Sequence, residues 1–273
     1  MSIDAEGGGI GDVLEIRSSA NERFRALQAL ARSARQRQSQ GLALIEGEHL
    51  VLGWLDARLG RPREVVLPRR SLGRAALESL CARAGGRVIV LDDALFDRVS
   101  QVEHGPGPLL IVSIPAVDCP DAIDDDALYL DGVQDPGNAG TILRSALAFG
   151  IRRVIASPDA VGLWSPKVLR AAMGAHFALQ IIENVPANRL LAACRRARPS
   201  AAEPRAALRV DDADLTVPRV WIFGSEGRGL SDGLASAAAI ERLAIPHDDA
   251  VESLNVGVAA SICLFEQYRQ RRC

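Results

Sequence analysis

Short apolar runs alternate with segments of helical periodicity through the first 115 residues of the chain. The apolar runs predict strands, and apolar residues three or four positions apart predict helices between them. The predicted strands span 42–46, 65–67, 88–91 and 109–114, and the predicted helices span 48–59, 71–84 and a short stretch ending at 99. Strands and helices alternating at this pace indicate an α/β unit of about one hundred residues.

The N-terminal part of this unit combines an apolar stripe with a basic side. Phe24, Leu27, Leu30 and Ala31 recur at helical spacing, which predicts one amphipathic helix over 19–38. Arginines occupy its other faces. Two interpretations stay open: such a side is usually a solvated surface, and otherwise it contacts phosphates.

A break in the pattern separates two halves. The segment PAVDCPDAIDDD contains two prolines and a cluster of aspartates, so we place a domain boundary there. The predicted organisation is a smaller first domain at 13–115, a linker at 116–126 and a second domain at 127–273. The opening MSIDAEGGGIGD, residues 1–12, lacks the pattern of a signal peptide and is interpreted as a flexible lead-in.

The second half repeats the alternation of strands and helices. Strands are predicted at 127–131, 154–156, 179–183, 207–210, 220–223 and in a short apolar run that begins at 243 and is stopped by Pro246. Helices are predicted at 139–149, 188–197, from 231 and in a short stretch ending at 175. This pattern predicts a second α/β domain with a mostly parallel sheet. Its ligands are expected at the carboxyl ends of the strands.

Three strands of this domain run into loops rich in glycine or polar residues. Leu130 leads into DGVQDPGNAGTILR, Phe223 into GSEGRGLS, and Ile245 into PHDDAVESLN. In an open sheet such loops lie at one edge, so they are expected to build one pocket. GSEGRG does not match GxGxxG, and GxxxxGK[ST] is absent, which disfavours a dinucleotide-binding oxidoreductase and a Walker-type phosphate loop.

The last helix is predicted to begin at about Ser253 and to be buried in its first half, because its residues are apolar on nearly every side. Ser253 and Asn255 therefore stand at the entrance of a buried helix. They either hold a small polar ligand or merely cap the helix and satisfy a neighbouring loop.

Composition narrows the class of protein. The 273 residues are 48% hydrophobic and 24% charged, which is typical of a soluble globular protein. No apolar run approaches the roughly eighteen residues of a membrane span, so a cytoplasmic protein is expected. The five cysteines never form a CxxC pair, so neither a disulfide framework nor a zinc site is indicated. The formal charge of −2 leaves only the local N-terminal arginines as a signal for nucleic acid.

Three motifs together closely resemble the signatures of the SpoU/TrmH family of S-adenosylmethionine-dependent RNA ribose 2′-O-methyltransferases. They are DGVQDPGNAGTILRSALAFGI, WIFGSEGRGLS and IPHDDAVESLNVGVAASICLFE, in the family's order and spacing, with SPKVLRAAMGAHF similar to its intermediate segment. IRSSANERFRAL and LALIEGEHLV resemble, more loosely, a substrate-binding domain with a fold like ribosomal protein L30e. The resemblance implies a deep trefoil knot in the second domain and a homodimer whose active site uses both subunits.

The resemblance also assigns roles to residues. It implies that Arg144 is the main catalytic residue, completed by Asn138, Glu226, Ser253 and Asn255. It implies that backbone around Phe223, Gly224, Gly229, Ile245 and Leu254 holds the cofactor, and no metal is required. Arg17, Arg23, Arg25 and Arg32 are the candidate RNA contacts. A guanidinium stays protonated at ordinary pH, so we expect Arg144 to bind the adjacent phosphate and stabilise the developing alkoxide rather than act as a base.

One loop departs from the family pattern. Family members often carry Met after the Ile-Pro of the third motif and glycine soon afterwards, whereas this chain has His247, Asp248, Asp249 and Ala250. A lone loop histidine is more often incidental than catalytic. The expected substrate is ribosomal RNA, with transfer RNA second, and the alternative is a non-catalytic RNA-binding or ribosome-assembly protein that keeps the fold. Binding of S-adenosylmethionine distinguishes the two.

Overall fold

The computed structural model describes residues 13–102 and 107–272, so the predicted lead-in at 1–12 lies outside the described residues. The chain divides into two compact units. The first contains the chain up to Pro115 together with Trp164–Pro166, and the second contains Ala116–Leu163 and the chain from Lys167 onward. The segment 116–126 belongs to the second unit, where Ile123 is fully buried and forms an isolated parallel β-bridge with Cys194.

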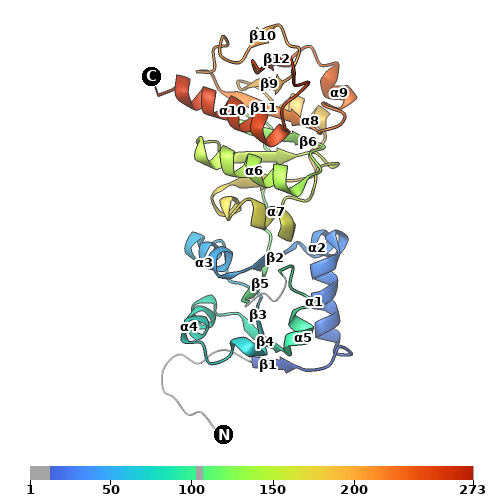
Figure 1. Cartoon of the computed structure of the whole chain (residues 1–273), viewed down its shortest axis with the longest axis vertical. Coiled ribbons are helices and arrows are strands. Elements are labelled where there is room, and N and C mark those ends of the chain that lie inside the picture. The colour runs from blue at the N-terminus through green and yellow to red at the C-terminus, as the bar shows by residue number, and fades with distance from the viewer. Residues whose placement is uncertain (1–12, 103–106, 273) are drawn as a thin grey trace. The chain divides into compact units, whose positions relative to one another are not determined.

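The first unit is a sheet covered by helices on both faces (Figure 1). Its strand order is β1 (Val13–Ile16), β4 (Arg87–Leu91), β3 (Glu64–Pro68), β5 (Leu109–Ser113) and β2 (Leu42–Glu46). The first three strands are parallel, and β5 runs antiparallel to both of its neighbours. One face is covered by α1 (Glu22–Arg32) and α5 (Asp93–Phe96), and the other by α3 (Glu48–Ala57) and α4 (Ala75–Ala84). A short 3-10 turn, η1 (Arg69–Ser71), follows β3.

The single helix predicted over 19–38 is wrong. The chain breaks at Ser33, which separates α1 from α2 (Ala34–Gln40) and accepts a hydrogen bond from the N–H of Gln36 at 3.3 Å. The guanidinium of Arg37 donates to the carbonyls of Leu30 at 2.7 Å and Ala31 at 3.2 Å. These bonds satisfy carbonyls that the end of α1 leaves free, so this arginine belongs to the fold rather than to a free basic surface.

The second unit contains a sheet of seven strands whose pairings are all parallel in the described part of the chain. Its order is β10 (Leu208–Arg209), β12 (Glu241–Ala244), β9 (Arg198–Ala202), β11 (Arg219–Gly224), β6 (Ala127–Asp131), β7 (Arg153–Ala156) and β8 (Gln180–Ile182). The prediction of a mostly parallel α/β sheet is confirmed. The threading of a knot stays a prediction.

Alternating side chains of β11 divide the core of this unit. Val220 and Ile222 pack with residues of α8 (Ala187–Ala193) and α9 (Asp232–Ala235) in one buried cluster. Trp221 points to the other face, where its indole N–H donates to Gln267 of α10 (Val256–Gln270). The helix α6 (Pro136–Ala148) lies beside α10 on this face, and its Ser145 hydroxyl is 2.7 Å from that of Ser261. The remaining elements are α7 (Pro166–Ala171) and the 3-10 turn η2 (Ala175–Ala178).

The last helix differs from its prediction in start and burial. It begins at Val256 and is capped by Asn255, whose side chain accepts from the N–H groups of Gly257 and Val258. Val258, Ile262 and Phe265 are 47%, 36% and 51% exposed. Their spacing places them on one face of α10, so only the opposite side of the helix is buried.

Candidate functional site

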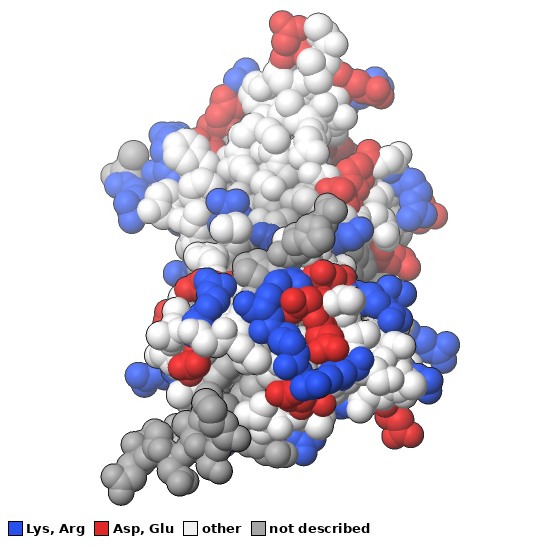
Figure 2. Space-filling view, turned by 60° about the horizontal axis from the view of Figure 1, so that its bottom comes forward, with Lys and Arg blue, Asp and Glu red and all other residues white. Residues whose placement is uncertain are grey.

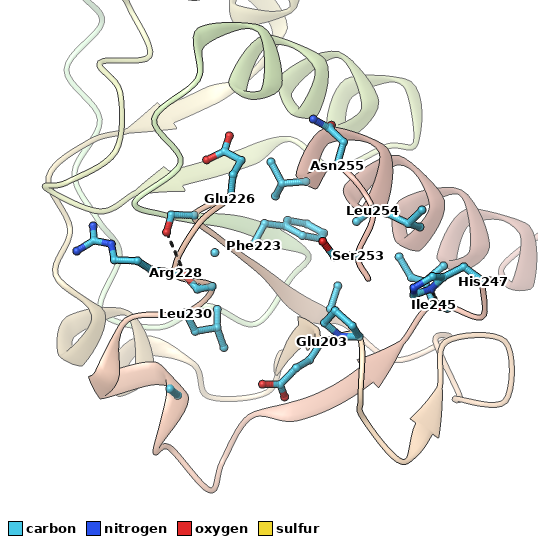
Figure 3. A pocket seen from close by; sticks show the side chains of 18 residues that line it. Glu203, Phe223, Glu226, Arg228, Leu230, Ile245, His247, Ser253, Leu254 and Asn255 are labelled. Carbon is cyan, nitrogen blue, oxygen red and sulfur yellow. Dashed lines mark hydrogen bonds between the residues drawn. The ribbon is translucent and has the colours of Figure 1, made fainter. Parts of the chain in front are cut away.

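A cleft of about 480 Å³ lies at the carboxyl ends of β9, β11 and β12, next to the start of α10 (Figure 3). The five residues expected around the cofactor all line it: Phe223, Gly224, Gly229, Ile245 and Leu254. Two of the three predicted loops therefore meet here, as expected for the strand ends of a parallel sheet. The volume falls within the range of small-molecule sites, which is about 300–1,000 Å³.

The loop after β11 has its shape because two glycines allow a close backbone contact. Ser225 and Gly229 exchange two backbone hydrogen bonds of 2.9 Å, which close the loop. Gly229 has a φ of +69°, which L side chains rarely adopt. A Cβ added at Gly224 would lie 2.4 Å from the carbonyl carbon and oxygen of Gly229. The loop can close over this wall of the cleft only if position 224 is glycine.

We expect Gly224→Ala to weaken cofactor binding by about tenfold or more, because the loop must move away from the strand end to make room for the methyl group. Calorimetric titration with S-adenosylhomocysteine measures the effect. Gly227→Ala in the same loop is the matched control, since a Cβ there meets nothing within 4 Å. Equal affinities for both variants and the wild type would contradict this explanation.

Three polar side chains from distant parts of the sequence form one hydrogen-bonded network. The side-chain amide of Asn138 donates to Oε1 of Glu226 at 2.7 Å, and its oxygen accepts from the amide of Asn255 at 2.9 Å. Asn138 lies in the first turn of α6, where its backbone N–H is capped by Asp135 at 2.8 Å. The oxygen of Asn255 caps α10, so its amide nitrogen is left to face Asn138. The cap of α10 thus orients the amide of Asn255, the cap of α6 holds the backbone of Asn138, and all three predicted loops converge.

The other two predicted catalytic residues are placed differently. Ser253 lines the cleft and is exposed. Arg144 is exposed and is absent from the lining, and among the described residues it has no hydrogen-bond or ion-pair partner. It lies six residues after Asn138 on α6, so the two side chains leave the helix in directions about 120° apart. Within one copy of the chain, Arg144 therefore points away from the network.

Several lining residues were not predicted as site residues. They include Glu203, Arg228 and His247. His247, expected to be incidental, has its Nδ1 2.7 Å from the carbonyl of Ile245. Because that nitrogen must donate, the neutral ring keeps Nε2 as an acceptor. The departure of His247 from the family motif could have marked it as a site residue. Nothing in the sequence indicated that Glu203 lines the cleft.

Two thiols of this unit, those of Cys194 and Cys263, do not suit nucleophilic catalysis. Burial raises the pKa of Cys263 on α10 to about 12 and that of Cys194 to about 11. Both therefore stay protonated at neutral pH. Over residues 13–102 and 107–272, no cluster of His, Cys, Asp and Glu suits a metal ion. Across the same residues, none of the helices combines the length and apolar character needed to span a bilayer.

Comparison with known proteins gives consistent matches. Residues 126–265 match the model of the SpoU rRNA methylase family. An uncharacterised tRNA/rRNA methyltransferase of Synechocystis is 31% identical over 267 residues, covering 95% of each chain. The 23S rRNA (guanosine-2′-O-)-methyltransferase of Coxiella burnetii is 34% identical over 253 residues, covering 83% of this chain and 95% of that one. An AdoMet-bound rRNA methyltransferase structure from Sinorhizobium meliloti has a TM-score of 0.80 at 26% identity and covers 95% of this chain and 98% of that one. The full-length matches include both units.

Proposed function

Because the chain belongs to the SpoU rRNA methylase family, we propose that it transfers the methyl group of S-adenosylmethionine to a ribose 2′-OH of structured RNA. Ribosomal RNA is the favoured substrate, since the Coxiella relative is named for 23S rRNA, and transfer RNA is second. The observation that carries the proposal is the network of Asn138, Glu226 and Asn255 beside the cleft. We place the reaction in the cytoplasm.

The cleft fits S-adenosylmethionine, which supplies an electrophilic sulfonium methyl group when bound. Phe223, Ile245 and Leu254 offer apolar walls for an adenine ring, and the closed loop at Gly224 and Gly229 presents backbone to the polar parts. Glu226 is exposed, and within residues 13–102 and 107–272 its only bonded partner is a neutral amide, so its negative charge favours a cation at this end of the cleft.

The protein's own residues would align and polarise the reacting hydroxyl. Asn138 and Asn255 fix Glu226 and one another at the edge of the cleft. Arg144 binds the phosphate next to the target ribose and stabilises the alkoxide that develops at the 2′-oxygen. Ser253 lies in the lining, where its hydroxyl can orient the sugar. No residue is assigned as the final proton acceptor.

A homodimer completes the site in this proposal. The apolar stripe of Val258, Ile262 and Phe265 on α10 is exposed in one copy. Such a stripe is typical of a surface that a second chain covers. Phe265 also contacts the ring of Phe149, at 5.8 Å between centroids, which extends the stripe toward the end of α6. Arg144 on α6 points away from the network of Asn138, Glu226 and Asn255 in its own chain. In a dimer its side chain can instead reach the network of the second copy.

RNA binding by the first unit is proposed for two of the four candidate arginines. Arg23 forms an ion pair with the buried carboxylate of Glu64, and Arg17 pairs with Glu15 at 3.0 Å. Arg25 and Arg32 are exposed, and no partner is found for either among the described residues. They are seven residues apart and share one face of α1. Figure 2 shows basic and acidic side chains interspersed on one face of the molecule. Arginines without an acidic partner are therefore better candidates for binding RNA phosphates than arginines that are already paired.

We expect Arg25→Glu combined with Arg32→Glu to weaken binding of ribosomal RNA by about tenfold at moderate salt, because two phosphate contacts become repulsive. Filter binding across a salt series measures both the affinity and its salt dependence. Arg195→Glu with Arg196→Glu is the matched control, as these two residues are also exposed and carry the same charge change. Equal losses for both pairs would remove the assignment to α1.

Cofactor binding distinguishes the enzyme from a non-catalytic RNA-binding protein. Calorimetry with S-adenosylmethionine is expected to give micromolar affinity for the full chain. No binding at millimolar cofactor would favour the non-catalytic protein. Mapping ribose methylation of ribosomal and transfer RNA in cells with and without the gene then identifies the target nucleotide.

A further inference from the structure

Glu203 is a carboxylate at the cleft for which the methyl-transfer chemistry gives no role. It follows the last residue of β9, and its backbone N–H donates to the carbonyl of Leu243 in the neighbouring strand region at 2.9 Å. Its side chain is 41% exposed and lines the cleft together with Pro204 and Ala202. Sheet hydrogen bonding therefore fixes the position of this residue at the strand end.

An arginine outside the lining orients this carboxylate. The guanidinium of Arg242 donates to Oε2 of Glu203 at 2.9 Å and also to the carbonyl of Ala235 at the end of α9. Oε1 of Glu203 accepts no hydrogen bond from the residues that the structure describes. One oxygen is thus held in place, while the other remains available to a ligand in the cleft.

The two carboxylates of the lining, Glu203 and Glu226, differ in position and in charge compensation. They lie on opposite sides of Phe223 and Ser253 (Figure 3). Among the described residues Glu226 has only a neutral amide as partner, whereas the charge of Glu203 is offset by Arg242. A cationic part of a ligand therefore gains more beside Glu226, and neutral hydroxyl donors suit Glu203.

From this geometry we infer that Glu203 is a cofactor-binding residue whose Oε1 accepts hydrogen bonds from the ribose hydroxyls of the adenosine part of S-adenosylmethionine. The inference depends on the proposed function for the identity of the ligand. It follows from the placement of the methyl group at the Glu226 end of the cleft, because the ribose then extends toward the opposite side. A carboxylate at a strand end binds a ribose diol in the same way in other open α/β sheets.

Glu203→Gln tests this role, because it keeps the shape of the side chain and removes its charge. Calorimetry with the full chain uses three ligands: S-adenosylhomocysteine, 5′-methylthioadenosine, which lacks the amino-acid part, and 2′-deoxy-5′-methylthioadenosine. We expect the variant to bind the first two about tenfold more weakly than the wild type. We also expect the wild type, but not the variant, to prefer 5′-methylthioadenosine strongly over its 2′-deoxy form.

Asp211→Asn is the matched control, since Asp211 is also paired with an arginine, Arg209 at 2.7 Å, but lies outside the lining. An unchanged melting temperature shows that each variant is folded. Loss of affinity for S-adenosylhomocysteine alone would assign Glu203 to the ammonium group and overturn the inference. Unchanged affinities, or the same preference for the 2′-hydroxyl in both proteins, would also overturn it. Failure of the wild type to bind S-adenosylhomocysteine would instead contradict the proposed function.

Discussion

Arg144→Lys is expected to lower kcat for ribose methylation by about 100-fold or more, with little change in cofactor affinity. In the proposed mechanism the guanidinium holds a phosphate through two parallel hydrogen bonds and faces the developing alkoxide, and a lysine ammonium could not keep both contacts in one geometry. Arg144 has no partner among the described residues of its own chain, so the substitution breaks no visible structural bond. Single-turnover methylation of ribosomal RNA, with cofactor binding measured separately, gives the two numbers.

Arg152→Lys is the matched control, because Arg152 is another exposed arginine that follows the same helix. Near-normal turnover of Arg144→Lys would show that positive charge alone is sufficient, and it would reject positioning by a guanidinium. A loss confined to cofactor affinity would move Arg144 to the cofactor site.

The second large effect is expected from Ile262→Asp. A carboxylate in the middle of the stripe on α10 would be buried without a partner in a dimer, so the dimer should dissociate into monomers. We expect methylation to fall by at least about tenfold, since Arg144 then lacks the neighbouring cleft. Light scattering after gel filtration measures the mass, and the same samples are assayed for methyl transfer.

Leu72→Asp serves as the control for this change, since Leu72 is 48% exposed and lies in the first unit. Two results would contradict a site shared between two subunits. One is a wild-type protein that is monomeric and active, and the other is an Ile262→Asp monomer that keeps full activity.

The sequence predicts well those elements whose own residues decide their structure. Continuous apolar strands such as β6, and loops marked by glycine and proline, are found where expected. The convergence of Asn138, Glu226 and Asn255 was also predictable, because parallel strands place their carboxyl ends at one edge.

The strand β9 was missed because its sequence, RPSAA, has no strand signal of its own. It forms because β11 and β12 pair with it on both sides, and the helix predicted up to 197 instead ends at Ala193. Glu203 was missed for the same reason, since its place in the cleft depends on that strand. Neighbouring strands supply information that a local sequence window does not contain.

The burial of the last helix was predicted wrongly for a different reason. Its residues are apolar on nearly every side, which predicts burial, yet Val258, Ile262 and Phe265 are exposed in one chain. Hydrophobic periodicity predicts that a helix face is buried, but it does not indicate whether the same chain or another chain buries it. The prediction of a buried helix and the proposal of a dimer therefore rest on the same apolar residues of α10.

Methyl transfer in a purified system decides whether the protein is a ribose 2′-O-methyltransferase. Wild-type protein is incubated with ribosomal RNA and S-adenosylmethionine labelled in its methyl group, and the RNA is digested to nucleosides for mass spectrometry. The predicted result is label in a single 2′-O-methylated nucleoside, with at most about one hundredth as much when Arg144→Lys is assayed at the same enzyme concentration within the initial-rate period. Label on a base, or no label in ribosomal or transfer RNA from a protein that binds the cofactor, would contradict ribose 2′-O-methylation.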